Sequence, residues 1–455
     1  MRRAGIFAVA LAGALVLDAG ARAADSPIPP GSELTLARAV ELARHYNPAR
    51  RSAESDSLAD SERVGEARSA FLPQVYGVGE YLRATDNGIG DTAYLPALGI
   101  SRAPSAGQNK NSLSDTFDNY TAGLSVFQYL FDFGRARGAL AERNADADAG
   151  RARLQLVDLD LVYQVSASYF SLVGAKEVVK VYEQAVTQRT ERLRAVNAKA
   201  SNGLVPQIDT YTAQAELARA KLHLVDARNA AATAKVALDT AMGLGDSAPD
   251  YTQPDTLGPP APPGPLEDYL HRAVDQRPDL KMLEDEARAA GARIEEYQSD
   301  YLPTLGAAAG YNLRGQDSTS ANNFYAGVVV TWPIFNGFLT EHQVAESRLR
   351  EDAVRHMIED LRQKVVYQVE RSYLDLQASS DRIHEAEQTL EASRVELDLA
   401  SKRYEGGLGN ILELADAQRR FTEDGAAFVR AKADSALAKA ALDRDTGTGL
   451  EPQAP

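Results

Sequence analysis

The sequence predicts an internally duplicated α+β membrane protein, in which each copy consists of two amphipathic strands followed by a very long helical hairpin. Three observations lead to this prediction. The chain of 455 residues matches itself at fixed offsets, and each half contains two segments that alternate apolar residues with small or polar ones. Long intervals in each half also lack proline and are dominated by strong helix formers.

The duplication is clearest when the sequence is shifted by 204 positions, which places Tyr163 on Tyr367 and Ser168 on Ser372. The same shift aligns further pairs over a long stretch without gaps: Phe131 with Phe335, Gly203 with Gly407, Leu238 with Leu442 and Gly243 with Gly447. A register that persists over so many residues indicates two copies of one structural unit.

Upstream of these residues the offset becomes 230, which places Pro48 on Pro278 and Glu66 on Glu296. The two offsets differ by 26 positions (230 against 204), so the first copy contains an insertion. It falls in residues 83–119, which are rich in Gly, Ser, Asn and Asp, the composition of an exposed loop. The corresponding residues 315–323 are expected to form a short loop.

The N-terminus has the features of a secretory signal peptide. Arg2 and Arg3 precede an apolar run, and the small-residue pattern ending at Ala23 follows it. We therefore expect residues 1–23 to be removed and the mature chain to leave the cytoplasm. The remaining predicted organisation is an N-terminal extension (24–35), a first repeat (36–248), a proline-rich linker (249–265), a second repeat (266–447) and a C-terminal tail (448–455).

Each repeat is expected to contain the same elements in the same order. In the first repeat these are helices within 36–71, strands at 73–82 and 120–131, and a helical hairpin over 134–242. In the second they are helices within 266–301, strands at 303–314 and 324–335, and a hairpin over 337–445.

The predicted strands have one apolar face. Tyr120, Ala122, Leu124 and Val126 alternate with small or polar residues, and residues 324–332 repeat the pattern. Strands of this period are typical of outer-membrane barrels, although a hairpin packed on a soluble core is the alternative. Because four strands cannot close a barrel of at least about eight, the barrel interpretation requires the chain to oligomerise.

The predicted long helices would each extend about 100 Å at 1.5 Å per residue. Each ends at a glycine turn, at Gly203 and at Gly407, and the chain then returns as a shorter helix. No globular core is that deep, so the hairpins are expected to pack side by side as coiled coils.

Composition argues against several classes of function. The formal net charge of −15 without a basic patch disfavours nucleic-acid binding. The absence of cysteine excludes disulfides and thiolate metal sites, and the six histidines have no metal-ligand spacing. Neither a phosphate-binding loop nor a nucleophile elbow is present, so we expect neither an enzyme nor a cofactor.

Four short segments together resemble the TolC family of outer-membrane channel proteins. Two are the hairpin turns, residues 200–209 and 404–413, and two are the passages from strand to helix, residues 131–134 and 332–337. The resemblance covers essentially the whole mature chain. It implies a homotrimer in which three sets of four strands form one 12-stranded transmembrane barrel, set in outer-membrane lipid, that a long helical coiled-coil barrel continues through the periplasm.

The implied activity is passive conduction. Such a protein is the outer-membrane exit duct of a tripartite efflux or type I secretion system, and its partners are a periplasmic adaptor protein and an inner-membrane pump or ABC exporter. The alternative is a structural periplasmic coiled-coil protein without channel activity.

The resemblance also implies a gate at the periplasmic end. Tyr404 and Asp209 would link neighbouring helix pairs, and Glu413 and Asp416 would form an acidic ring that favours cations. Gly409 stands where the best-known family members have an arginine, which departs from the family's charged gate. The alternative for Asp209 and Glu413 is that each carboxylate simply interacts favourably with the N-terminal turn of its helix.

The residues at the two hairpin turns are predicted to contact the adaptor. They are Gly203, Leu204, Gly407 and Leu408. The alternative for these residues is that they only supply the backbone geometry that ends a helix.

Overall fold

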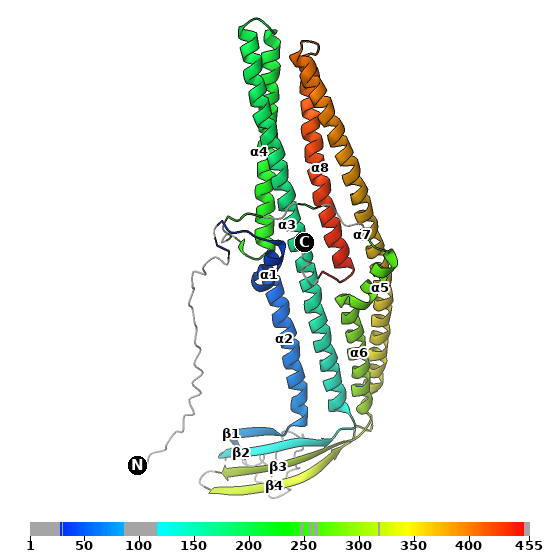
Figure 1. Cartoon of the computed structure of the whole chain (residues 1–455). Helices are drawn as coiled ribbons and strands as arrows, with labels where there is room; N and C mark the ends of the chain where they lie inside the picture. Colours follow the sequence, from blue (N-terminus) through cyan, green and yellow to red (C-terminus); the bar gives the residue numbers. More distant parts are fainter. Residues whose placement is uncertain are drawn as a thin grey trace, which may run out of the picture.

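The protein is a long helical assembly with a small antiparallel sheet at one end and two helical hairpins whose turns lie at the other (Figure 1). The computed structural model describes residues 28–29, 31–85, 116–245, 248, 250–253, 257–258, 263–316 and 319–449. The predicted signal peptide, most of the predicted outer loop, and parts of the linker and of the C-terminal tail lie outside the described residues. The predicted α+β fold class is confirmed.

Both repeats have the same order of elements. The first contains α1 (Leu36–Tyr46), α2 (Pro48–Arg68), the short 3₁₀ helix η1 (Ser69–Phe71), β1 (Gln74–Thr85), β2 (Thr116–Phe131), α3 (Arg135–Ser201) and α4 (Gln207–Ala241). The second contains α5 (Leu266–Gln276), α6 (Pro278–Ser299), β3 (Thr304–Gln316), β4 (Thr319–Thr331), α7 (Leu339–Glu405) and α8 (Ile411–Asp445).

Local sequence accounts for most helix boundaries. The Asn47 side chain caps α2 by accepting the Ala49 amide at 2.9 Å, and Pro48 occupies the first helical position, where no amide is required. The hairpin helices α3 and α7 each end in a glycine with a left-handed backbone, Gly203 at φ 70° and Gly407 at φ 73°. In both turns the next leucine amide bonds back to a carbonyl five residues earlier, which is a Schellman cap.

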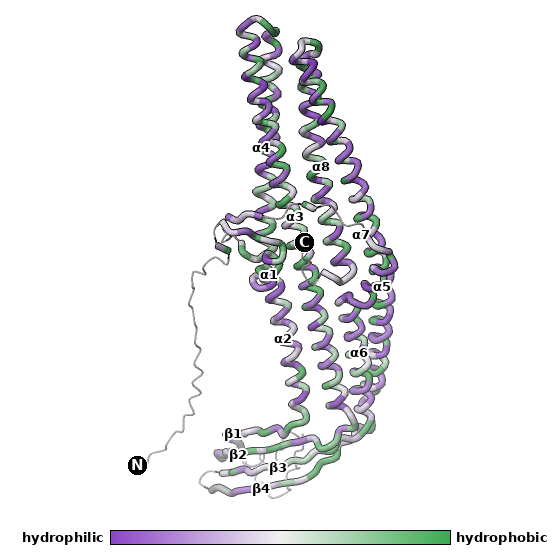
Figure 2. Tube along the Cα trace, in the orientation of Figure 1, coloured by the Kyte–Doolittle hydropathy of each residue, from purple (hydrophilic) through white to green (hydrophobic). Residues whose placement is uncertain are grey.

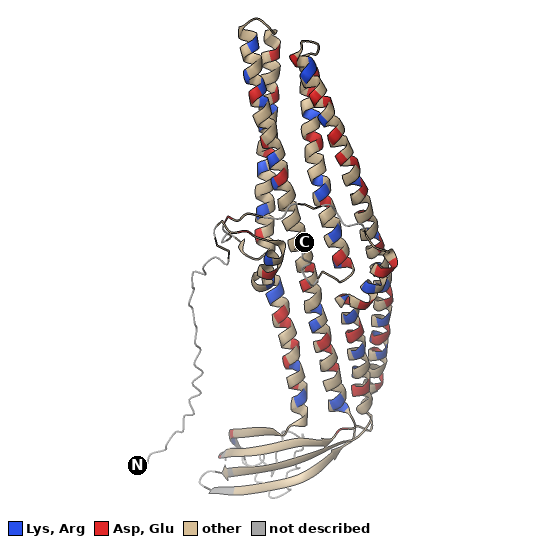
Figure 3. Ribbon diagram, viewed as in Figure 1, with Lys and Arg blue, Asp and Glu red and all other residues tan. Residues whose placement is uncertain are grey.

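The four strands form one antiparallel sheet in the order β1-β2-β3-β4. Its register brings the predicted apolar positions together on one face: Tyr81 lies opposite Tyr120, and Tyr311 lies between Leu124 and Phe324. Side chains on this face are largely exposed in the single chain, Phe324 by 70%. Charged residues are spread along the helices but are sparse on the strands (Figure 3).

The strand bounds differ from those expected. β4 begins at Thr319 and ends at Thr331, whereas residues 324–335 were expected. Its early end follows from Pro333, which has no amide to donate to a ladder. The ladder between β3 and β4 continues to the pair Gln316 and Thr319, so most of the predicted short loop at 315–323 belongs to strands. β1 and β2 likewise extend into both ends of the predicted loop at 83–119, pairing Thr85 with Thr116.

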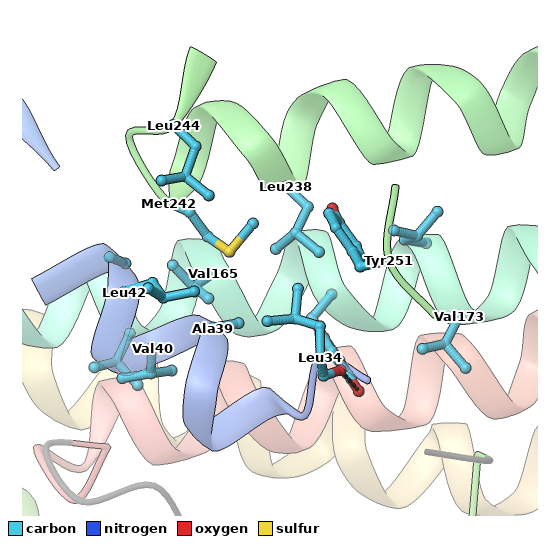
Figure 4. Packing of buried hydrophobic residues seen from close by; sticks show 14 of the residues in the cluster. Leu34, Ala39, Val40, Leu42, Val165, Val173, Leu238, Met242, Leu244 and Tyr251 are labelled. Atoms are coloured by element: carbon cyan, nitrogen blue, oxygen red, sulfur yellow. Dashed lines mark hydrogen bonds between the residues drawn. The ribbon is translucent and has the colours of Figure 1, made fainter. Parts of the chain in front are cut away.

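The main hydrophobic core lies near mid-length, where α1 packs on α3 and the end of α4 (Figure 4). Tyr169 is fully buried there and donates its hydroxyl to the Leu34 carbonyl at 3.0 Å, which fixes the N-terminal extension on α3. A second core occupies the equivalent place in the other repeat. Equivalent buried pairs in the two cores are Ala43 and Ala273, Val165 and Val369, Leu172 and Leu376, and Leu238 and Leu442.

Hydrogen bonds join the C-terminal end of α4 to the junction between α1 and α2, and the C-terminal end of α8 to the junction between α5 and α6. The Asn47 side-chain amide donates to the Ala241 carbonyl at 3.0 Å, and the Arg277 guanidinium donates to the Asp445 carbonyl at 3.3 Å. These pairs obey both offsets, since 47 and 277 differ by 230 and 241 and 445 by 204. The duplication therefore extends to tertiary contacts.

Polar and apolar residues are interspersed along the hairpins (Figure 2). Among the described residues, no helix is both long and apolar enough to cross a membrane.

Candidate functional site

The hairpin turns bring the predicted gate residues Tyr404 and Asp209 together. Tyr404 lies in the last turn of α7 and Asp209 in the first turn of α4, and the Tyr404 hydroxyl donates to the Asp209 carboxylate at 3.2 Å. Both are buried, with 6% and 9% of their surface exposed. A small apolar cluster from α3, α4, α7 and α8 surrounds the tyrosine ring.

Two cations of α3 lie against the same ring. The Arg192 guanidinium and the Lys199 ammonium are 5.7 and 5.5 Å from the Tyr404 ring centroid, within the range of cation–π attraction. Arg192 also donates to the Ser401 hydroxyl at 3.1 Å, so α3 is joined to α7 by polar contacts. Burial and the nearby Asp209 charge raise the pKa of Tyr404 above its usual value of 10, so its hydroxyl remains a donor.

Glu413 lies close to these groups but has a different partner. Its backbone amide is capped by the Asn410 side chain at 2.7 Å, and its carboxylate accepts the Arg403 Nε at 3.0 Å. Arg403 reaches it across the turn and also donates to the Leu408 carbonyl at 3.2 Å. Gly409 leaves room for this arginine, because a Cβ at that position would lie 3.1 Å from the Arg403 Cβ.

Asp416 is also paired with arginine. Its carboxylate accepts the Arg419 Nη2 at 3.0 Å, and Arg420 lies at 3.9 Å. Glu413 and Asp416 are 43% and 57% exposed at the side chain. The two acidic groups are thus exposed, as a ring at a pore mouth requires, but each has a cationic neighbour in its own chain.

The tip residues lie as a contact surface would require. Leu204 and Leu408 are 73% and 78% exposed, and each follows the left-handed glycine of its turn. Glycine is needed at both turns for the backbone, so helix-cap geometry and an exposed leucine coexist at each tip.

Several charged residues near Tyr404, Asp209, Glu413 and Asp416 were not among the residues predicted from the sequence. Arg419 and Arg420 stand three and four positions after Asp416, a spacing that predicts ion pairs on a helix and could have revealed them. Arg192 and Arg403 act across helices or across a turn, which spacing does not indicate. Arg189 is 93% buried between α3 and α8 and reaches the Gln418 carbonyl at 3.4 Å, and burial lowers its pKa.

In the part of the chain that the structure describes, no group of three or more His, Asp or Glu side chains is placed to hold a metal ion. Three of the polar contacts at the tips join different hairpin helices: Tyr404 with Asp209, Arg192 with Ser401 and Arg403 with Glu413. Such an arrangement can hold two helix pairs together or release them.

Comparison with known proteins yields one family and several structural neighbours. The sequence pattern of the family described as "Outer membrane efflux protein" matches residues 39–244 and 269–448. The outer membrane efflux protein BepC of Brucella suis is 25% identical over 418 residues, which cover 91% of this chain and 85% of BepC. The alkaline protease secretion protein AprF of Pseudomonas aeruginosa is 23% identical over 343 residues, covering 72% of this chain and 69% of AprF.

The solved open-state structure of the Neisseria gonorrhoeae MtrE outer membrane channel has the same fold. It superposes with a TM-score of 0.74 at 20% sequence identity, over 91% of this chain and 89% of MtrE.

Proposed function

Because the chain belongs to the outer membrane efflux protein family, we propose that it forms the outer-membrane exit duct through which an inner-membrane pump and a periplasmic adaptor expel their substrate. The protein is an outer-membrane channel protein of the efflux and secretion class, with a large periplasmic helical part. Its family is one of channels rather than of enzymes.

The open ends of the sheet carry the proposal of a homotrimer. Within the described chain, β1 and β4 are the outer strands of the sheet, and each pairs on one side only. A sheet that continues from β4 of one chain to β1 of the next would close with 12 strands in three chains, which removes every exposed edge. The sheet's exposed apolar face would then contact lipid.

Helix α4 and helix α7 each carry a row of exposed apolar side chains. Leu222, Val225 and Val236 are each more than 60% exposed on α4, and Tyr367 and Leu374 are equally exposed on α7. Figure 1 shows these helices on opposite flanks of the chain. A ring of copies would bring the α4 flank of one chain against the α7 flank of the next, which is a heterologous contact.

We assign the gate to the tip polar network. The Tyr404–Asp209 link would hold the α7–α8 pair against α3 and α4, and Glu413 and Asp416 would line the opening. The support is geometric: the first pair is buried and bonded, and the second is exposed close by. Because three arginines accompany the two carboxylates, we expect a mouth of mixed charge rather than a strongly anionic ring.

Replacing Glu413 and Asp416 together by alanine is expected to weaken the block of single-channel current by multivalent cations in planar bilayers. The change leaves Arg403, Arg419 and Arg420 without these carboxylates, so the mouth becomes more positive. Asp398→Ala is the matched control, because it removes an exposed carboxylate of α7 that pairs with Lys402. Block unchanged in the double variant, or weakened equally in the control, would reject the ring.

The exposed tip leucines are our candidates for adaptor contact. Leu204→Asp together with Leu408→Asp is expected to reduce export to the level of a deletion strain, because a charge at each tip disfavours an apolar contact. Export of a drug panel and of secreted polypeptides would be measured in the complemented deletion strain. Methionine at both positions is the conservative control and should export normally.

The same variant distinguishes the duct from a structural coiled-coil protein. Purified wild-type and variant proteins should both have the mass of a trimer and conduct ions in planar bilayers, because the tips lie far from the sheet. A wild-type protein that stays monomeric and conducts no current would contradict the duct. Normal export by the double aspartate variant would contradict the adaptor assignment alone.

A further inference from the structure

The internal duplication allows an intersubunit contact to be derived from a contact inside one chain. Helix α3 of the first repeat packs against α6 of the second. The element equivalent to α3 is α7, and the element equivalent to α6 is α2. Within one chain α2 packs on α3, so the equivalent partner for α7 must come from another copy.

The α3–α6 contact is built around one ion pair. The Arg293 side chain of α6 donates two hydrogen bonds to Glu142 of α3, the Nε bond at 3.0 Å. Glu142 is only 4% exposed, and this pairing with Glu142 raises the pKa of Arg293. A buried carboxylate of this kind requires its partner, because an unpaired charge in the same place would be costly.

The two registers place opposite charges at the equivalent positions. Glu142 shifted by 204 is Glu346 on α7, and Arg293 shifted by 230 is Arg63 on α2. Another pair of contacts supports both offsets in these helices. In the first repeat Arg50 forms ion pairs with both Glu54 and Asp158. The equivalents of Glu54 and Asp158 are Glu284 and Arg362, which form an ion pair with each other in the second repeat.

Burial differs between the equivalent faces. Gly138 and Glu142 of α3 contact α6, and the helical period places Ala145, Ala149 and Ala152 on the same side of α3. All five residues are buried. Their equivalents on α7 are all exposed: His342, Glu346, Leu349, Ala353 and His356. Leu349 is 70% exposed where Ala145 is 5% exposed, so α7 presents an apolar and charged stripe that lacks the cover its counterpart has within the described chain.

We propose that this α7 stripe packs against α2 of a second copy of the chain, with Glu346 of one chain paired to Arg63 of the next. The inference rests on the trimer proposed above and specifies its helical interface. In the isolated chain both side chains are more than half exposed, and among the described residues their ion pairs are with neighbours one helical turn away, Arg63 with Asp60 and Glu346 with Arg350. Both are thus accessible to a partner from another chain.

One position predicts a difference between the two contacts. A Cβ at Gly138 would lie 2.8 Å from the Glu296 backbone nitrogen, so α3 and α6 cross very closely. His342 stands at the equivalent point of α7. The α7–α2 crossing must therefore be wider there, and the Arg63–Glu346 pair is expected to be less buried than the Arg293–Glu142 pair.

Cross-linking tests the register directly, because the sequence has no cysteine. Arg63→Cys with Glu346→Cys, treated with a short bis-maleimide on intact outer membranes, is expected to give a covalent trimer as the main end product. Each chain would contribute one cysteine to each of two contacts, so the ring closes at three. Arg63→Cys with Glu359→Cys is the matched control, since the second cysteine moves about 20 Å along α7.

The outcomes separate this inference from the trimer itself. If the untreated protein has the mass of a trimer but the two cysteine pairs cross-link equally, the register is wrong and the trimer stands. If the wild-type protein forms no trimer, both fail. Each single cysteine variant should give no cross-link, and a dimer formed by Arg63→Cys alone would indicate a symmetric contact and overturn the proposal.

Charge reversal provides a second test that does not depend on the cysteine variants. Arg63→Glu alone and Glu346→Arg alone should each lower the temperature at which the trimer dissociates in detergent, because like charges then face each other. The double reversal should recover part of that loss, because the pair between chains is restored while Asp60 and Arg350 still face like charges in their own helices. Equal or additive losses in the double variant would contradict the pair.

Discussion

Gly243→Ala is expected to lower the free energy of unfolding by about 2–5 kcal/mol. A left-handed backbone, here at φ 76°, costs an L-residue roughly 1–2 kcal/mol. The added Cβ would also lie 2.7 Å from the Asn47 Cα and from the Tyr46 carbonyl oxygen, and relieving such overpacking costs about 1–3 kcal/mol more. Far-UV circular dichroism of the detergent-solubilised protein against guanidinium would measure the loss.

Two other glycines serve as graded controls. Gly31 has nearly the same backbone, φ 75°, and its Cβ would have no atom within 4 Å from the described residues other than its chain neighbours, so Gly31→Ala should show the backbone cost alone. Gly447 is the equivalent of Gly243 in the second repeat, and its Cβ would lie 3.1 Å from the Gln276 carbonyl, so its effect should be intermediate. Equal losses of stability at all three positions would show that the close approach of Gly243 to Tyr46 and Asn47 adds nothing to the cost of the substitution.

Tyr404→Phe is expected to open the channel. It removes the hydroxyl that donates to Asp209 but keeps the ring that packs in the tip cluster and faces Arg192. A hydrogen bond to a charged group contributes about 1.5–3 kcal/mol, so each chain should shift the equilibrium toward the open state roughly 10- to 100-fold. Planar-bilayer conductance should rise, and cells should become sensitive to large antibiotics that the closed duct excludes.

The controls separate the lost hydrogen bond from a general disturbance of the tips. Tyr211→Phe removes a hydroxyl from an exposed tyrosine near the start of α4, two residues after Asp209, and should leave conductance unchanged. Asp209→Asn keeps an acceptor for Tyr404 and should open the channel less than Tyr404→Phe. Wild-type conductance in Tyr404→Phe would mean that the link does not hold the gate.

The sequence predicted the architecture well where the determining interactions are local. Residues 135–201 and 339–405 are helical because they lack proline and are rich in helix formers, and the left-handed turns at Gly203 and Gly407 follow from glycine itself. Strand ends were less predictable. The pairing of Gln316 with Thr319 depends on the neighbouring strand, which a single segment does not reveal.

Part of the candidate site was likewise predicted before the structure, and part was not. The resemblance supplied Tyr404 and Asp209, which lie 195 positions apart in sequence, and the structure shows the bond between them. Their roles in gating remain proposals. The arginine that pairs with Glu413 was not predicted, because Arg403 reaches it only across the space that Gly409 leaves.

By itself, the sequence determined the duplication, the paired amphipathic strands, the long helical hairpins and the glycine turns, because each depends on the residue types in one continuous segment. Only the tertiary structure decided which polar groups meet: Asn47 with the end of α4, Arg277 with the end of α8, and Arg293 with Glu142. Those pairings depend on how distant helices are packed side by side. The same packing shows that α7 has an exposed face where its counterpart α3 has a buried one.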